Sequence, residues 1–118
     1  MPVRVVLPKL FGGGGDLKNI TWDPFREGVD IHRLYGDPTD GASAALLRYA
    51  PGARVPKHRH NGFEHILVLE GSQQDEQAIY LAGTLLINGP GSGHSVASET
   101  GCVVLAIWEK PVDMQFYV

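Results

Sequence analysis

The sequence predicts an all-β protein, a single domain built as an antiparallel sandwich or barrel. Short apolar runs alternate with turn signals rich in glycine and proline, of which the 118 residues contain 15 and 8. The turn signals recur about every 8–12 residues, a spacing typical of such folds. Apolar residues nowhere recur at helical spacing over a convincing length, and the chain length suits one hydrophobic core.

The first 40 residues are irregular, whereas the rest of the chain divides into expected strands. The glycine run at residues 12–15 is expected to be flexible, and residues 29–35 to form a short strand between turns at residues 23–30 and 36–41. Residues 65–71 and 102–108 are almost continuously apolar, as in a strand that is buried on both faces. Further strands are expected at residues 3–8, 43–49, 78–83, 84–89 and 114–118.

Composition excludes several classes of protein. The net charge is −3 and the basic residues are scattered, so we expect no nucleic-acid partner. No apolar stretch is long enough to span a membrane, and the N-terminal apolar run is interrupted by Arg4, Pro8 and Lys9, unlike a signal peptide. Cys102 is the only cysteine and cannot form an internal disulfide. We therefore expect a cytoplasmic protein.

The segment PKHRHNGFEH contains three of the five histidines. His58 and His60 are two residues apart, so on a strand they point to the same face and form a ready chelate. A further histidine, His94, directly follows the tight connection at residues 89–93. That position suits a side chain that points inward from a barrel wall.

The third ligand in this segment depends on the turn that follows. A two-residue hairpin turn at residues 61–62 would bring His65 to the chelate and turn Glu64 away. A three-residue loop at residues 61–63 would instead place Glu64 beside the two histidines and leave His65 outward. Both geometries are allowed by the residues alone.

These residues resemble the two motifs of the cupin superfamily. The first motif, G-x5-H-x-H-x3-E-x6-G, is matched in every fixed position, and the second, G-x5-P-x-G-x2-H-x3-N, is matched in part. In the second, Gly89 stands where the proline is expected, the proline is displaced by one to Pro90, and Ser98 replaces the asparagine. Over roughly residues 20–112 the chain resembles the ChrR-like branch in particular. The matching residues are Gly52, His58, His60, Glu64 and Gly71, followed by Gly83, Gly91 and His94.

The resemblance implies an RmlC-like jelly roll, an antiparallel β-barrel in which residues 1–118 form one cupin domain. Residues 1–20 would be an N-terminal extension or edge strand, and residues 44–108 the barrel core. It also implies one divalent metal ion per chain, held by His58, His60, Glu64 and His94. This ligand set suits Zn, Fe(II), Mn, Ni or Cu, while the lone cysteine rules out a structural zinc finger.

Two functions are open. The favoured one is a metalloenzyme, a dioxygenase or related oxidoreductase that acts on a small carbonyl or phenolic compound; no catalytic residue is assigned. The alternative is a metal-dependent sensor or ligand-binding regulatory module related to anti-sigma factors. We expect a small-molecule ligand and a homodimer. A sigma factor is an unlikely partner, since the roughly 50 residues before the first motif contain no cysteine and no helical pattern.

Other reactive side chains are expected to be structural. We expect His65 to face outward or to replace Glu64, His32 to be an ordinary strand residue, and Cys102 to be a buried, inert thiol. The pair Asp75–Glu76 is expected in a solvated turn and Glu99 in a solvent-facing loop. The aromatic residues Tyr80, Trp108 and Phe116 are expected in the core.

Overall fold

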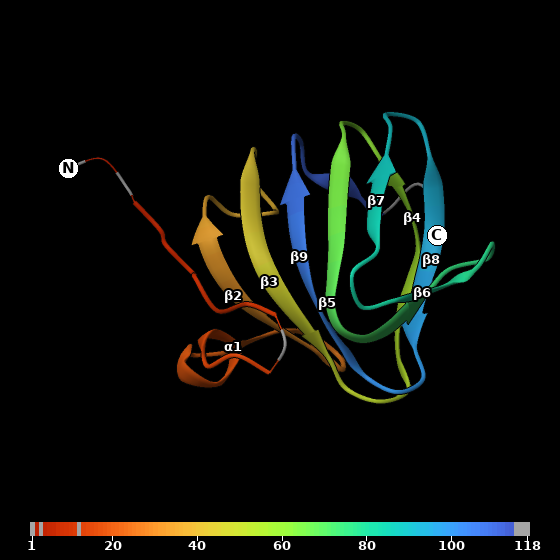
Figure 1. Cartoon of the computed structure of the whole chain (residues 1–118). Helices are drawn as coiled ribbons and strands as arrows, with labels where there is room; N and C mark the ends of the chain where they lie inside the picture. The colour runs from red at the N-terminus through yellow and green to blue at the C-terminus, as the bar shows by residue number, and fades with distance from the viewer. Residues whose placement is uncertain (1, 3, 12, 115–118) are drawn as a thin grey trace.

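The computed structural model describes residues 2, 4–11 and 13–114, which form a strongly curled antiparallel sheet (Figure 1). One short helix, α1 (Asp16–Asn19), precedes the strands in this part of the chain, where no helix is long and apolar enough to cross a membrane. The strands are β1 (Asp23–Arg26), β2 (Val29–Tyr35), β3 (Ser43–Tyr49), β4 (Ala53–His60), β5 (Glu64–Gln74), β6 (Ile79–Leu81), β7 (Leu85–Asn88), β8 (Gly93–Ser98), β9 (Cys102–Trp108) and β10 (Val112–Asp113). The prediction of an all-β fold is confirmed.

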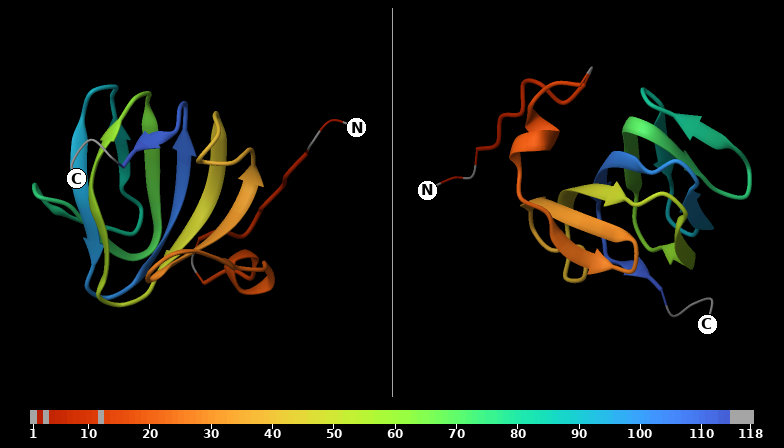
Figure 2. Two further views of the ribbon diagram at one scale, coloured as in Figure 1. Left: turned by 180° about the vertical axis from the view of Figure 1, so that it is seen from behind. Right: turned by 90° about the horizontal axis from the view of Figure 1, so that it is seen from below.

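The strand order is β1-β2-β3-β9-β5-β8-β4-β10, with β6 and β7 also paired to β5. β5 connects the two walls of this half-barrel. The first part of β5 pairs with β7 and β9, and its last residues pair with β6 and β8. Figure 2 shows the sheet curling around an interior, with α1 outside it.

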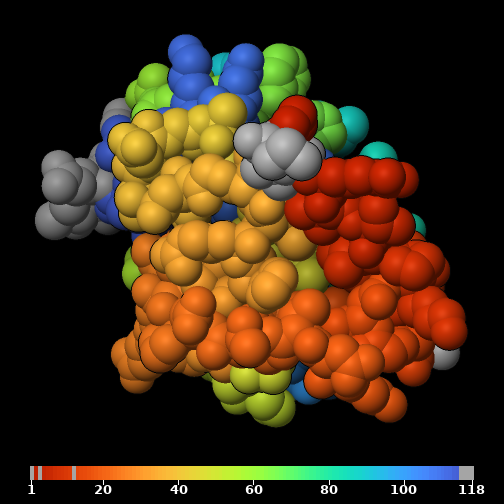
Figure 3. Space-filling view, turned by 90° about the vertical axis from the view of Figure 1, so that its left-hand side faces the viewer, coloured from red at the N-terminus to blue at the C-terminus, as the bar shows by residue number. Residues whose placement is uncertain are grey.

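Apolar side chains form two separate clusters, one on each face of the curled sheet. The inner cluster fills the half-barrel and includes Ile31, Val68 and Val104, all fully buried. The outer cluster is covered by the N-terminal segment, which contributes Leu17 against Leu46 of β3. Figure 3 shows this segment lying beside the strands at the β1–β2 edge. β3 and β9 are therefore buried on both faces, as the continuous apolar run at residues 102–108 predicts.

The structure differs from the expected elements in the following places. The hairpin considered at residues 61–62 does not form, because β4 pairs with β8 and β10 and not with β5. Among the described residues of the segment 3–8 no strand forms. Residues 115–118, most of the last expected strand, lie outside the described residues, as does Phe116. β1 occupies a stretch that was interpreted as a turn.

Gly71 allows β5 to cross from one wall to the other. Its φ is 70°, in the left-handed region that residues with a Cβ rarely adopt. The ladder between β5 and β9 is irregular just before it, between Val68 and Glu70. A Cβ at Gly71 would also collide with the backbone carbonyl of Gly101. The conformation and the close approach both require glycine here.

We predict that Gly71→Ala lowers the free energy of unfolding by at least about 1–3 kcal/mol, the strain of a non-glycine residue in this region. Urea unfolding measures the change. The matched control is Gly41→Ala, because no heavy atom lies within 4 Å of a Cβ built at Gly41 and its φ is not in the left-handed region. Equal losses in the two variants would contradict the assignment.

Candidate metal centre

Three histidines converge on the inner face of the half-barrel. His58 and His60 lie on β4, and His94 lies on β8 directly opposite His58 in the antiparallel register. All three are buried, with 5%, 2% and 9% of their surface exposed. One ring nitrogen of each lies within 4.8 Å of the others, and the rings meet edge to face.

Hydrogen bonds fix the outward nitrogen of two of the rings. His58 Nδ1 lies 2.9 Å from the carbonyl oxygen of Pro56, which only accepts, so Nδ1 carries the proton. His60 Nδ1 lies 3.0 Å from Ser92 Oγ, and the Ser92 hydroxyl donates to the Gly89 carbonyl, so this Nδ1 also donates. Nε2 of both rings is therefore left with a free lone pair, the state in which imidazole binds a metal.

Burial lowers the pKa of His58 below its ordinary value, and the neighbouring His94 ring adds to this effect. The hydrogen bond to Pro56 and the charge of Glu64 act in the opposite direction but do not reverse the shift. The neutral ring at pH 7 keeps its lone pair available.

A carboxylate lies beside the third ring, His94. Asp75 Oδ2 lies 3.6 Å from His94 Nδ1, a distance for electrostatic attraction rather than a hydrogen bond. Burial acts to raise the pKa of Asp75, but backbone N–H groups of Gln77 and Ala78 and the Tyr80 hydroxyl outweigh it, so the pKa is lowered. The group therefore stays ionised beside the ring.

His60 Nε2 is a buried polar atom without a hydrogen-bond partner among the described residues. It lies 3.1 Å from Glu64 Oε1, but the direction of approach does not make a hydrogen bond. An orphaned nitrogen of this kind is costly in the absence of a partner, so the donor set fits a cation.

Glu64 borders the histidine cluster, with Oε1 also 3.8 Å from His94 Nε2. Its neighbours across the sheet are Trp108 on β9 and Asn88 on β7. The Trp108 indole donates to Oε2 at 2.8 Å and the Asn88 amide donates to Oε1 at 3.0 Å. Burial alone would raise the pKa of Glu64, but positive charge at the His60 and His94 positions and the hydrogen bond from Trp108 lower it to about 2. The buried group is thus a fixed anion.

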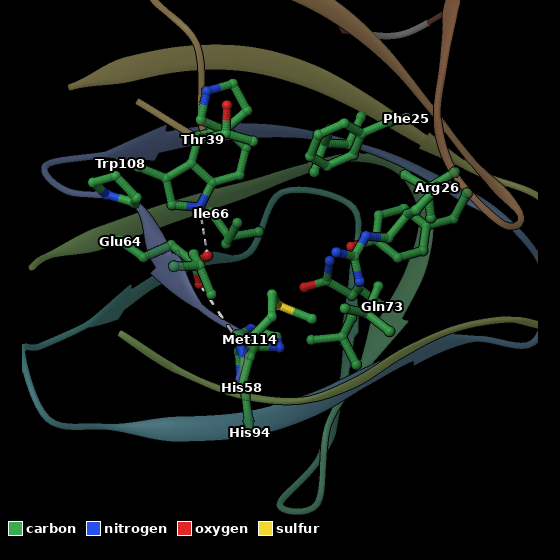
Figure 4. A pocket seen from close by; sticks show the side chains of 18 residues that line it. Phe25, Arg26, Thr39, His58, Glu64, Ile66, Gln73, His94, Trp108 and Met114 are labelled. Atoms are coloured by element: carbon green, nitrogen blue, oxygen red, sulfur yellow. Dashed lines mark hydrogen bonds and ion pairs between the residues drawn. The ribbon is translucent and has the colours of Figure 1, made fainter. Parts of the chain in front are cut away.

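A cavity of about 230 Å³ opens beside this cluster and is lined mainly by apolar side chains (Figure 4). His58, Glu64 and His94 form part of its wall, whereas His60 does not line it. A small molecule in the cavity could reach the cluster without opening the sheet.

The remaining candidates lie away from the cluster. His65 points to the outer face, where it is paired with Ile87 and Ile107, so the structure places Glu64 and not His65 with the histidines. His32 bonds the Thr21 carbonyl through Nδ1 at 2.8 Å. Glu99 is exposed in its loop. Burial raises the pKa of the Cys102 thiol to about 11, as expected of an inert cysteine.

Sequence reasoning missed the residues that orient the site. Trp108 and Asn88 flank Glu64, and Ser92 holds His60, yet none of them belongs to a recognisable local pattern. Asp75 and Glu76 were expected to be solvated. Glu76 is exposed, as expected, and accepts the Ser95 backbone N–H of β8, whereas the Asp75 side chain is mostly buried and faces His94. Only knowledge of the strand register would have found these contacts.

Comparisons with known proteins show what the chain is similar to. A family model described as the ChrR cupin-like domain matches residues 14–111. The anti-sigma-E factor ChrR of Cereibacter sphaeroides is 34% identical over 102 residues, which cover 84% of this chain and 46% of that protein. The chain thus spans about half the length of that curated relative.

Two solved structures are similar in fold. The first is Rhodobacter sphaeroides SigE in complex with the anti-sigma ChrR, with 32% identity and a TM-score of 0.69 over 78% of this chain and 51% of that chain. The second is an acetylacetone dioxygenase from Acinetobacter johnsonii, with 16% identity and a TM-score of 0.69 over 77% of this chain and 69% of that chain. The second likeness, at so low an identity, concerns the fold alone.

These relatives contradict the prediction made from the sequence that a sigma factor is an unlikely partner. The matched curated protein is an anti-sigma factor, and a matched structure contains ChrR bound to SigE. The prediction was wrong because it relied on the length of chain before the first motif, which carries no information about segments beyond this sequence.

We predict that Trp108→Phe raises the pKa of Glu64, because the variant lacks the indole N–H that stabilises the carboxylate. A depressed pKa contributes stability that is present above pH 4.5, the ordinary pKa of the group, and is lost as the pH falls towards about 2. The variant should therefore lose about 1.5–3 kcal/mol at pH 7, the contribution of a hydrogen bond to a charged group, and depend less on pH below 4.5.

Urea unfolding at several pH values, with a chelator present, measures both effects. Trp22→Phe is the matched control, because Trp22 belongs to the outer cluster and its ring stacks with Arg48 rather than with a carboxylate. An unchanged pH dependence in Trp108→Phe would show that the indole does not hold Glu64 ionised.

Proposed function

This chain belongs to the ChrR cupin-like domain family, and on that premise we propose that it is a metal-binding regulatory domain that acts in sigma-factor control. The family model covers residues 14–111, almost the whole described part of the chain. The proposal has two parts, a metal site and a partner, and each has its own support.

The proposed ligands are Nε2 of His58, His60 and His94 together with the Glu64 carboxylate. The observation that carries this proposal is the orphaned Nε2 of His60, which is buried beside an ionised carboxylate and two further ring nitrogens. Three imidazoles and one carboxylate suit Zn, Fe(II), Mn, Ni or Cu. When bound, the metal supplies a Lewis acid with coordination positions left for a ligand.

The chain's own residues would link the metal to the rim of the half-barrel. The His60 backbone makes two hydrogen bonds with the connection between β7 and β8, from its N–H to the Ser92 carbonyl and from the Gly91 N–H to its carbonyl, both 2.8 Å. The Ser92 hydroxyl bonds the same histidine ring. A ligand that tightens or releases His60 would therefore stiffen or loosen an exposed loop that a protein partner could contact.

Sigma-factor control is proposed from the relatives. The anti-sigma-E factor ChrR is 34% identical to this chain, and a related structure contains ChrR with SigE. Because the chain spans about half the length of ChrR, we assign it the role of a regulatory unit that changes the affinity for the sigma factor, rather than the whole inhibitory surface.

A second candidate is a small oxygenase or related oxidoreductase that acts on a carbonyl or phenolic compound. The cavity beside His58, Glu64 and His94 favours it, since a substrate placed there would lie next to the metal positions. Oxygen consumption by the iron-loaded protein with small diketones distinguishes an enzyme from a regulatory domain.

We predict that the purified protein contains about one divalent metal ion per chain, and that His60→Ala loses most of it because a buried ligand is removed. Elemental analysis measures the metal. His65→Ala is the matched control, since His65 is the neighbouring histidine that faces outward, and it should keep its metal. Equal metal contents in the two variants would rule out the proposed ligand set.

We also predict that the metal-loaded chain binds the sigma-E-type factor of its own organism at least about 10-fold more tightly, or more weakly, than the chelated chain, the size of a typical coupling between two sites. Calorimetric titration with and without metal measures the difference. The Glu99→Gln variant, changed in an exposed loop, is the control. An affinity that does not depend on the metal would contradict the regulatory role.

A further inference from the structure

The cavity beside the metal ligands has a second polar end. Figure 4 shows Arg26 and Gln73 on one side of the cavity and Glu64 with Trp108 on the other. The wall also includes Tyr49 near Arg26 and Gln73, since both groups influence the titration of its hydroxyl. We call Arg26, Tyr49 and Gln73 the arginine end.

The strand register places Arg26 inside the half-barrel. Arg26 of β1 pairs with Val29 of β2, and Val29 pairs with Tyr49 of β3. Residues in one such row share a face of the sheet, and Val29 and Tyr49 are buried in the inner core. Arg26 is half-buried at the end of the row, beside the Phe25 ring, which lies 5.7 Å from its guanidinium carbon.

No ion pair joins Arg26 to another described residue, in contrast to Arg33 and Arg48, which pair with Asp37 and Asp30 on the exposed surface. A guanidinium that is half-buried and without a counter-charge attracts an anion strongly, because little water competes for it. Its five N–H donors form a fork that matches a carboxylate.

The other two groups of this end can donate hydrogen bonds as well. Burial raises the pKa of Tyr49 well above its ordinary value, and the Cys102 and Glu64 groups act in the same direction, so the hydroxyl keeps its proton. The Gln73 side chain is almost fully buried and offers an amide N–H₂ group. The arginine end thus combines one positive charge with neutral donors and contains no acidic side chain.

We infer that the cavity binds a small, largely apolar carboxylate whose anionic group pairs with Arg26 and whose body extends towards the metal ligands. A volume of about 230 Å³ is below the range of about 300–1,000 Å³ of cavities for drug-sized ligands, so the ligand has the size of an aromatic or short aliphatic acid. The inference deepens the proposed function and rests on it in one respect: binding of the carboxylate would be the event that changes the affinity of the metal-binding domain for its sigma factor.

Isothermal titration of the zinc-loaded full chain tests the inference with benzoate against benzamide and hexanoate against hexanamide. Each pair has the same shape and differs in charge. We expect the acids to bind at least 10-fold more tightly than the amides. Arg26→Gln should weaken acid binding on the order of 10- to 100-fold, the loss expected for a charge-assisted hydrogen bond, and should leave amide binding and metal content unchanged.

Two further variants control the experiment. Arg26→Lys keeps the charge and should retain part of the preference for acids, which a merely misfolded variant would not do. Arg54→Gln removes the same charge from an exposed position on β4 and should bind acids like the wild type. Acid and amide binding of equal strength, absence of acid binding up to millimolar concentration, or acid binding unaffected by Arg26→Gln would each overturn the inference.

The outcomes separate this inference from the proposed function. If acids bind in an Arg26-dependent way while the sigma factor binds regardless of metal, the carboxylate site at the arginine end is supported and the regulatory role is contradicted. If the metal controls sigma-factor binding while acids and amides bind alike, the regulatory role is supported and the carboxylate site at the arginine end is contradicted.

Discussion

Three imidazoles and a carboxylate share the interior of this small half-barrel, and the cost of removing them from water constrains the structure around them. Buried polar groups are stable only when they are hydrogen-bonded or bound to an ion. Pro56 and Ser92 accept from the outward nitrogens of His58 and His60, while Trp108 and Asn88 donate to Glu64. These contacts satisfy the outward side of the cluster and leave His60 Nε2 without a partner inside it. A cation bound between the rings would resolve this imbalance.

Local sequence patterns predicted many of the strands and the His58–His60 pair. They did not predict the contacts that depend on which strands pair with each other. The strands at residues 43–49 and 102–108 were predictable because their apolar runs are continuous, and His58 and His60 because their spacing matches one pleat. The partners of Glu64 were not predictable, since Trp108 lies 44 residues away and reaches it only through the pairing of β5 with β9. Arg26 was interpreted as part of a turn because its strand, β1, consists of four residues and includes a proline.

The cavity gives the buried cluster access to small molecules while the sheet shields it from bulk water. Glu64, at one end, is held as an anion by its neighbours, and Arg26, at the other end, is a cation without a counter-ion among the described residues. A carboxylate paired with Arg26 would extend its apolar body to the proposed metal ligands at the other end. Because His60 is bonded through its backbone to the connection that contains Gly91 and Ser92, such a ligand could change the rim of the half-barrel without unfolding it.

The most direct test is a crystal structure of the zinc-loaded protein with anomalous diffraction recorded at the zinc edge. The account predicts one anomalous peak per chain, about 2.0–2.2 Å from Nε2 of His58, His60 and His94 and from an oxygen of Glu64. A peak at another site, or an inner face in which the three rings remain together with no zinc between them, would contradict it.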